Sequence, residues 1–166
     1  MPIPLQARIY TEAMAPRVAG FVCGTRRFEK AMADWITRPD LLNYIAQRGN
    51  TVWLYFTPED DLVGFGSLGA STWGPLDGPR FSLTIIPALA IRSEYQGKPD
   101  DVEERDKFSH QIMRDLIGRA KPLGRPILGL FVHPRNTRAI RLYVKFGFEK
   151  VQRAGNGHDQ MMLRLQ

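Results

Sequence analysis

The sequence predicts a single mixed α/β domain, and three observations point to it. The chain has 166 residues, which suits one domain around one core. Hydrophobic residues make up 43% of the chain and charged residues 24%, as in an ordinary folded protein. Segments with helical spacing alternate with segments rich in β-branched and aromatic residues, and no repeat or linker separates them. We therefore expect one domain over residues 1–166.

Two helices are predicted near the start of the chain. In residues 25–37, four apolar side chains recur at helical spacing and form one apolar face. Residues 40–47 have the same spacing, and Gly49 follows as a stop signal.

Three strands follow. Residues 51–57 are β-branched and aromatic, and they form a hairpin with residues 62–73. The second strand is rich in glycine, which permits a bulge or a close approach of another backbone. Residues 81–92 form the third strand, and Pro87 predicts a local irregularity there because it removes a ladder donor.

The second half of the chain predicts helical crossovers between strands. The expected elements are a helix over 108–120, a buried strand over 127–132, a helix over 136–146, and closing strands over 148–152 and 160–165. The predicted order is therefore two helices, three strands, a helix, a strand, a helix and two strands.

Net charge and composition limit the classes of binding partner and the location that we expect. The formal net charge is +6, which favours polyanionic partners such as a phosphorylated cofactor or RNA, although many soluble proteins are simply basic. No apolar run approaches the roughly 20 residues of a membrane span, and we see no secretory signal. Cys23 is the only cysteine, which excludes an intramolecular disulfide and favours a cytoplasmic location.

Two segments carry chemical signals. Residues 89–98, LAIRSEYQGK, end a strand and precede a helix, and such a glycine-containing turn presents main-chain N–H groups to phosphates. In residues 132–148, VHPRNTRAIRLYVKFGF, Asn136 suits a helix cap and Gly147 suits a left-handed helix end. Tyr143 lies two turns into that helix. Taken singly, each feature also occurs in ordinary turns and packed helices.

Together the two segments resemble the GNAT acyltransferase superfamily. LAIRSEYQGK is similar to the first part of the family's cofactor turn. The family's late signature, an Asn, an Ala, a Leu-Tyr and a Gly-Phe, is matched at Asn136, Ala139, Leu142, Tyr143, Gly147 and Phe148. The resemblance implies a single-domain GNAT fold, with a mixed, mostly antiparallel sheet of six to seven strands flanked by about four helices.

The resemblance also implies an N-acetyltransferase that moves an acetyl group from acetyl-CoA to a primary amine by direct attack in a ternary complex. A main-chain N–H of the strand would polarise the thioester carbonyl. No metal is implied. The implied cofactor-binding residues are Leu89, Ala90, Ile91, Gln96, Gly97, Lys98, Ser109, His110, Asn136, Ala139 and Leu142.

Two catalytic residues follow from the resemblance and from position. Tyr143 matches the family's tyrosine that protonates the leaving thiolate, and the alternative is a packing role. A phenol with a pKa near 10 is a reasonable acid towards a thiolate whose parent thiol has a pKa of about 8.5. Glu94, near the strand end, is the candidate general base, directly or through water, and the alternative is a solvated carboxylate. Weaker candidates are Asp60, Asp61, His110 and His133.

One departure from the family lies after Lys98, where glycines are expected and this chain has Pro99, Asp100 and Asp101. We interpret residues 99–107 as an insertion that loops into solvent, which brings Ser109 and His110 to the family's helix start. The alternative is weakened or abolished cofactor binding, because acidic residues beside a pyrophosphate would repel it. Positive charge could come from Lys98, Lys107 and Arg114.

The acceptor is expected to be a small-molecule or peptide amine, bound between the early helices and the strand and loop of residues 64–73. There Phe65 and Trp73 either line a pocket or belong to the core. Homodimers are common in the family, so the resemblance leaves a homodimer open.

Two other functions remain open at this point. One is a basic RNA-associated or regulatory module with a degenerate cofactor site. The other is acetylation of aminoacyl-tRNA, because the FVCG segment at Cys23 is similar to one in toxin-like GNAT proteins. Cys23 itself is expected to be structural, because no local base would activate it.

Overall fold

The computed structural model describes residues 3–75, 77–96 and 107–165. The described residues form one eight-stranded sheet with the order β1-β2-β3-β4-β6-β8-β7, and β5 pairs with β3 off this path. The strands are β1 (Gln6–Ile9), β2 (Thr51–Phe56), β3 (Leu62–Trp73), β4 (Phe81–Ile86), β5 (Leu89–Ile91), β6 (Ile127–Val132), β7 (Glu149–Arg153) and β8 (Asp159–Arg164). β4 and β6 are parallel, and the other described pairs are antiparallel.

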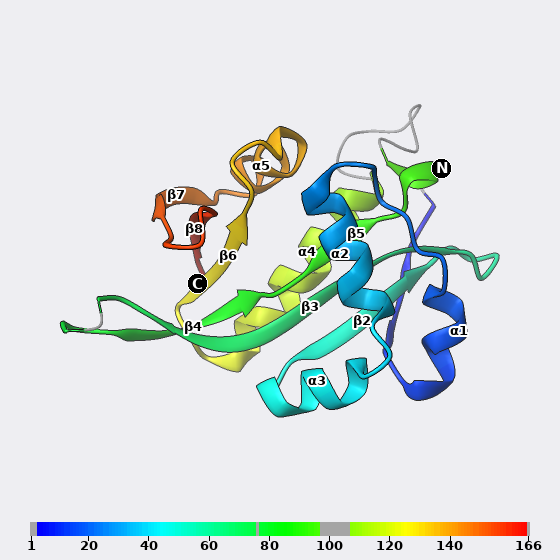
Figure 1. Ribbon diagram of the computed structural model, residues 1–166, viewed down its shortest axis with the longest axis horizontal. Coiled ribbons are helices and arrows are strands. Elements are labelled where there is room, and N and C mark those ends of the chain that lie inside the picture. The colour runs from blue at the N-terminus through cyan, green and yellow to red at the C-terminus, as the bar shows by residue number, and fades with distance from the viewer. Residues whose placement is uncertain (1–2, 76, 97–106, 166) are drawn as a thin grey trace.

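Helices cover both faces of this sheet. In Figure 1, α2 and α3 lie in front of the sheet and α4 lies behind it. The α-helices are α1 (Ala15–Val18), α2 (Arg27–Thr37), α3 (Leu41–Arg48), α4 (Phe108–Ala120) and α5 (Thr137–Lys145), and short 3-10 turns include η2 (Ser93–Tyr95). The mixed α/β domain is thus confirmed, with more strands and helices than the predicted six to seven and about four.

Two apolar clusters hold these layers together. The cluster on the α4 face includes the fully buried Ile112, Met113 and Leu116. The cluster under α2 and α3 includes Ile36, Leu41 and Phe65. Gly66 of β3 lets α4 approach the sheet, because a Cβ there would lie 2.8 Å from a methyl group of Leu116.

Most predicted elements lie where the sequence placed them, but α1 and β1 were not predicted and one predicted strand is divided. β1 was not predicted, because its four residues lack a clear alternation and are held as a strand by pairing with β2. The predicted strand over 81–92 is two strands, β4 and β5, interrupted at Pro87 and Ala88. The irregularity expected from the proline is therefore present.

Candidate active site

The break between β4 and β5 is stabilised by one serine of β3. The Ser67 hydroxyl accepts a hydrogen bond from the Ala88 N–H at 2.9 Å and donates one to the Ala88 carbonyl at 2.8 Å. Both contacts are buried, so the side chain replaces a ladder pair that the main chain lacks there. After this point β5 follows β3 alone, while β4 pairs with β6 only as far as Ile86 opposite Leu130.

One edge of β5 is consequently open. The Arg92 N–H donates to the Val63 carbonyl at 2.8 Å, in register with the β3–β5 pairs. Main-chain groups alternate in direction along an antiparallel strand, so those of Ala90 also point to β3, and those of Leu89 and Ile91 point away from it. Among the described strands, none pairs with that outer edge. Of the strand residues predicted to hold a cofactor, Ala90 therefore has its main chain paired with β3. The main-chain groups of Leu89 and Ile91 face the unpaired edge of β5, which we call the gap.

Gly64 explains how β5 comes so close to β3. A Cβ at this position would lie 2.4 Å from the Ala90 carbonyl oxygen, a separation that no side chain tolerates. The close backbone approach predicted for the glycine-rich strand is thus found here.

Gln96 closes the end of β5 with its side chain. Its Nε2 donates to the Ile91 carbonyl at 2.9 Å and to the Cys23 carbonyl at 2.6 Å. Its Oε1 accepts from Nη1 of Arg138 on α5 at 2.5 Å. The Ile91 carbonyl is therefore occupied, and the Leu89 N–H, the Leu89 carbonyl and the Ile91 N–H are the groups left on the open edge.

Tyr143 lies on α5 and is buried, with 7% of its surface exposed. Its ring packs against Phe148 with centroids 5.7 Å apart, and it belongs to the same apolar cluster as Leu89 and Ile91. Burial raises the pKa of Tyr143 to about 12. Within the described residues its hydroxyl makes no hydrogen bond. A protonated phenol is therefore held in the apolar layer that also contains the β5 side chains.

The other residues of the late signature shape α5. Asn136 precedes its first turn, and its Oδ1 accepts from the Ala139 N–H at 3.3 Å, which is the predicted cap. Gly147 has φ +97°, the left-handed conformation predicted for the helix end. Ala139 and Leu142 are partly buried against the apolar cluster that includes Tyr143.

The predicted phosphate turn is only partly described. Gly97 and Lys98, with residues 99–106, lie outside the described residues. Ser109 and His110 are in the first turn of α4, where the N–H groups of His110 and Gln111 bond back to the Lys107 carbonyl. His110 is buried against Phe146, and burial, then the positive charges of Lys107 and Arg114, lower its pKa.

The candidate bases occupy different environments. Glu94 is in η2, and its carboxylate is 58% exposed and paired with Arg92 at 2.7 Å. Asp60 binds Arg8 and Arg17 on the surface, so its pKa is lowered by these hydrogen bonds. The Asp61 carbonyl accepts from the Thr57 N–H in the turn between β2 and β3.

An aromatic cluster contains the remaining candidate, His133. Its ring stacks on Phe28 of α2 with centroids 5.0 Å apart, and His158 packs edge-on against it at 5.7 Å. The Nδ1 of His133 accepts from the Arg135 N–H at 3.1 Å, whereas the buried Nδ1 of His158 has no partner among the described residues. The sequence did not indicate that Phe28 and His158 contact His133, because only folding brings these three segments together.

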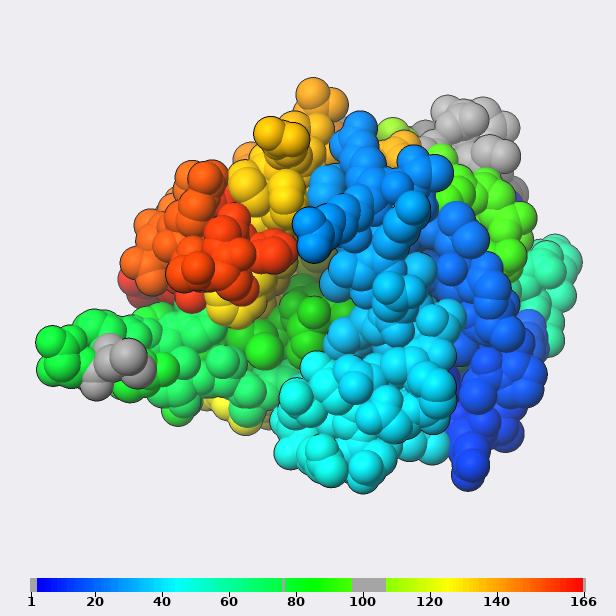
Figure 2. All heavy atoms as spheres, in the orientation of Figure 1, coloured from blue at the N-terminus to red at the C-terminus, as the bar shows by residue number. Residues whose placement is uncertain are grey.

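The face on which an acceptor was expected is hollowed. Figure 2 shows recessed atoms in the green of β4 and β5 between α2 (blue) and the β7–β8 hairpin (orange to red). Phe65 and Trp73 are core residues: Phe65 is fully buried and stacks on Trp35, and Trp73 packs against Phe131.

Cys23 is buried as well. Burial and, to a smaller extent, the charge of Glu29 raise the pKa of its thiol to about 11, which fits the predicted structural role.

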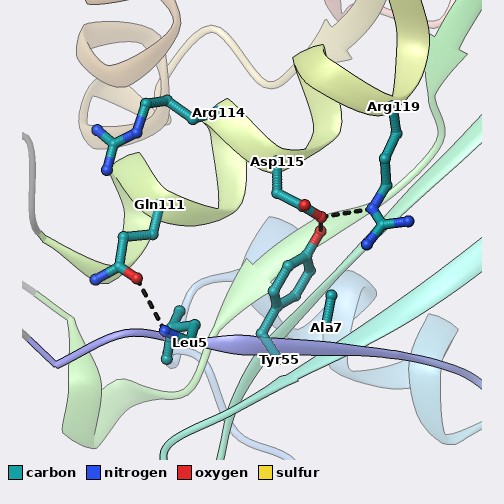
Figure 3. A pocket seen from close by; sticks show the side chains of 7 residues that line it. All are labelled: Leu5, Ala7, Tyr55, Gln111, Arg114, Asp115 and Arg119. Carbon is teal, nitrogen blue, oxygen red and sulfur yellow. Dashed lines mark hydrogen bonds and ion pairs between the residues drawn. The ribbon is translucent and has the colours of Figure 1, made fainter. Parts of the chain in front are cut away.

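A separate cavity of about 460 Å³ lies between β1, β2 and α4, across β3 from β5 (Figure 3). Within it Asp115 Oδ2 accepts hydrogen bonds from the Tyr55 hydroxyl and from Arg119 Nε, both at 2.7 Å. Arg114, a predicted source of positive charge for the cofactor, lines this cavity. Among the residues that the structure describes, none of those predicted to be catalytic or to bind the cofactor lines it.

No protein-family model and no curated protein matches the chain. Solved structures match over nearly its whole length. A mutant of the toxin AtaT, bound to the C-terminus of the antitoxin AtaR and acetyl-CoA, has a TM-score of 0.69 at 16% identity, covering 97% of this chain and 93% of that one. The KacTA–DNA complex has a TM-score of 0.67 at 18% identity, with the same coverage.

A further match is an acetyltransferase of the GNAT family from Staphylococcus aureus Mu50, with a TM-score of 0.67 at 16% identity, covering 98% of this chain and 99% of that one. At these identities the likeness shows the fold: the chain has the fold of GNAT acetyltransferases, as its two motifs predicted.

Within the described residues, no helix combines the length and apolarity needed to cross a membrane. The same residues contain no group of three or more His, Cys, Asp and Glu side chains that could hold a metal ion.

Proposed function

We propose that this chain is an acyl-CoA-dependent N-acyltransferase that moves an acetyl group from acetyl-CoA to a primary amine. The observation that carries this proposal is the open edge of β5, where the main-chain groups of Leu89 and Ile91 face a gap. Unpaired donors and acceptors in a partly apolar gap are costly unless a ligand or water satisfies them. The amides of a pantetheine arm and a thioester carbonyl would satisfy them.

The main chain of β5 would orient and polarise the acyl donor. The Leu89 N–H or the Ile91 N–H donates to the thioester carbonyl, where negative charge develops as the amine attacks. These donors are held rigidly, because β5 is paired with β3 and is anchored by Ser67 and Gln96. Ala90 pairs with β3 through its main chain, and its side chain is buried in the apolar cluster under α2 and α3.

Tyr143 would protonate the departing thiolate. The amine nitrogen forms its bond to the carbonyl carbon as the carbon–sulfur bond breaks, and the phenol proton passes to sulfur. A pKa of about 12 keeps Tyr143 protonated at neutral pH, and the same apolar surroundings raise the pKa of a leaving thiol. The proton released by nitrogen goes to water or to Glu94, our candidate base, and Tyr143 then recovers a proton.

The other predicted cofactor contacts are part of the proposal. Asn136 caps α5, and Ala139 and Leu142 lie within that helix. Ser109 and His110 lie in the first turn of α4, where the positive end of the helix dipole attracts phosphate. The acetyl-CoA present with one structural neighbour supports this choice of donor. A cytoplasmic location and a homodimer stay predictions.

Ligand-dependent stability tests the proposal directly. Millimolar acetyl-CoA should raise the melting temperature, because a ligand that binds only the native state stabilises it. Adenosine 3′,5′-bisphosphate, which lacks the pantetheine arm, should raise it less. A panel of amines, followed by the release of free thiol, would then identify the acceptor. Absence of any melting shift with acetyl-CoA would overturn the proposal.

A second candidate function is toxin-like acetylation of aminoacyl-tRNA, or RNA association without catalysis. It is supported by the +6 charge and by the likeness to AtaT, which is described as a toxin. The helix α2, which borders the hollowed face, carries exposed cations such as Arg27 and Lys30 that have no acidic partner among the described residues. Transfer of acetyl to charged tRNA, but not to free amines, would favour this candidate.

A further inference from the structure

The side-chain amide of Gln96 joins three segments where the chain leaves β5. Both of its N–H donors are used, by the carbonyls of Cys23 and Ile91. Its Oε1 is therefore held in one direction, and it accepts from Arg138 Nη1 at 2.5 Å. The guanidinium of Arg138 is thus positioned beside the end of β5, although the two residues are 42 positions apart in the chain.

Among the described residues, no acidic side chain neutralises this guanidinium. Within residues 3–75, 77–96 and 107–165, Arg138 makes no ion pair and no hydrogen bond other than that to Gln96. A guanidinium has five N–H donors, so most of them are available to another ligand. An amide oxygen is a weaker partner than a phosphate, which can accept two parallel hydrogen bonds from an arginine.

The location is where the phosphates of a thioester cofactor are expected. Tyr95, which precedes Gln96, packs edge-on against Phe108 in the first turn of α4, with ring centroids 5.8 Å apart. Tyr95 therefore contacts the start of α4, and the next residue, Gln96, contacts Arg138. The uncharged pantetheine arm would lie along β5, so the charged end of the cofactor would leave the gap beside this segment.

We propose that Arg138 is a phosphate-binding residue for the acyl-CoA donor, held ready for a phosphoryl oxygen by its hydrogen bond to Gln96. This inference rests on the proposed function and names the residue that supplies charge where this chain departs from the family's glycine turn. On binding, phosphate oxygens replace the Gln96 amide oxygen or engage the unused guanidinium donors. Arg138 thereby contributes to recognition of the phosphates and not of the thioester.

A comparison of two acyl donors tests this assignment. Acetyl-CoA carries phosphates, and S-acetyl-pantetheine has the same thioester and arm without them. Arg138→Gln should raise the Kd for acetyl-CoA about tenfold. This loss is at the lower end of the range for removing a hydrogen bond to a charged group, because the site is exposed. The same variant should leave the Kd for S-acetyl-pantetheine within about twofold of the wild type. Arg138→Lys, which keeps the charge, should recover part of the affinity.

Arg141→Gln is the matched control. It removes the same charge from an exposed position one turn away on α5, and it should change neither Kd by more than about twofold. Equal weakening of both donors by Arg138→Gln would mean that the residue supports β5 through Gln96, and it would overturn the phosphate contact. An effect no larger than that of Arg141→Gln would overturn it as well. Failure of the wild type to bind acetyl-CoA would overturn the proposed function itself.

Discussion

At the scale of single residues, the site depends on groups whose hydrogen bonding is left incomplete. The Tyr143 hydroxyl has no hydrogen-bond partner in the described part of the chain, and the outward N–H groups of β5 face a gap. Such groups cost stability unless a ligand completes them. This is the pattern expected of atoms that act on a substrate.

Tyr143→Phe separates catalysis from packing, because it removes the hydroxyl and keeps the ring that contacts Phe148. We expect turnover to fall about 10²-fold or more, as for the removal of a general acid, with the acetyl-CoA melting shift retained. Since the pKa of Tyr143 is about 12, the ratio of wild-type to variant rates should stay constant from about pH 7 to 10. Steady-state rates across that range measure it, and a ratio that falls with a midpoint near pH 8 would contradict the assignment.

The same variant has a signature in stability. The folded state holds the Tyr143 proton up to about pH 12, whereas an unfolded tyrosine releases it near pH 10. Its contribution to stability is complete below about pH 10 and disappears as the pH rises through about 12, a loss of about 3 kcal/mol. Urea unfolding at about pH 8 and about pH 11 should therefore show a smaller alkaline decrease in stability for Tyr143→Phe than for the wild type.

At the scale of secondary-structure elements, the gap exists because β4 and β5 are two strands and not one. The chain shifts at Pro87 and Ala88, and β5 then stays with β3 while β6 continues without it. The sequence predicted an irregularity at Pro87 but not its consequence. That consequence depends on Ser67, which satisfies the Ala88 main chain from a neighbouring strand.

Ser67→Ala should therefore destabilise the fold and disturb the site together. It leaves the Ala88 N–H and carbonyl without partners in a fully buried place, at a cost on the order of 2–3 kcal/mol. We expect a lower urea midpoint and a weaker acetyl-CoA melting shift. Ser71→Ala on the same strand is the control, because no hydrogen bond of the Ser71 side chain is present among the described residues. Equal midpoints for the two variants would show that Ser67 does not anchor β5.

At the scale of the whole molecule, the face in Figure 2 is hollowed between α2 and the β7–β8 hairpin, and the chain carries a formal net charge of +6. The positive charge raises the local concentration of polyanions, whichever acceptor the site uses.

RNA binding, where it occurs, should weaken steeply with salt. Affinity for a single-stranded RNA should fall by an order of magnitude or more between about 50 and 200 mM salt, because counterions are released on binding. The double variant Arg27→Gln, Lys30→Gln on α2 should make the plot of log affinity against log salt concentration shallower. Its slope should fall by about one unit for each phosphate that is no longer neutralised. Arg164→Gln, at the far end of β8 from the hairpin turn, is the control. Lack of retention on RNA at low salt would exclude this function.

The motifs predicted the fold, the cap at Asn136 and the helix end at Gly147 because these signals are local. The bounds of β3, α4 and β6 follow from residue spacing, and the Asn136 cap and the Gly147 helix end require only neighbouring residues. The roles of Glu94 and Tyr143 in catalysis stay predictions. Glu94 forms an exposed pair with Arg92, an arrangement that no residue spacing indicated.

By itself, the sequence determined most of the helices and strands, and which of them carry the acyltransferase motifs, because periodicity, capping and turn chemistry act within a few residues. Only the tertiary structure decided that β1 is a strand, that the main chain of Ala90 faces β3 while Leu89 and Ile91 face the gap, and that Arg138 meets Gln96. Those features depend on pairing and hydrogen bonding between residues far apart in the chain. Such contacts form only when folding brings distant segments together, and no local pattern specifies them.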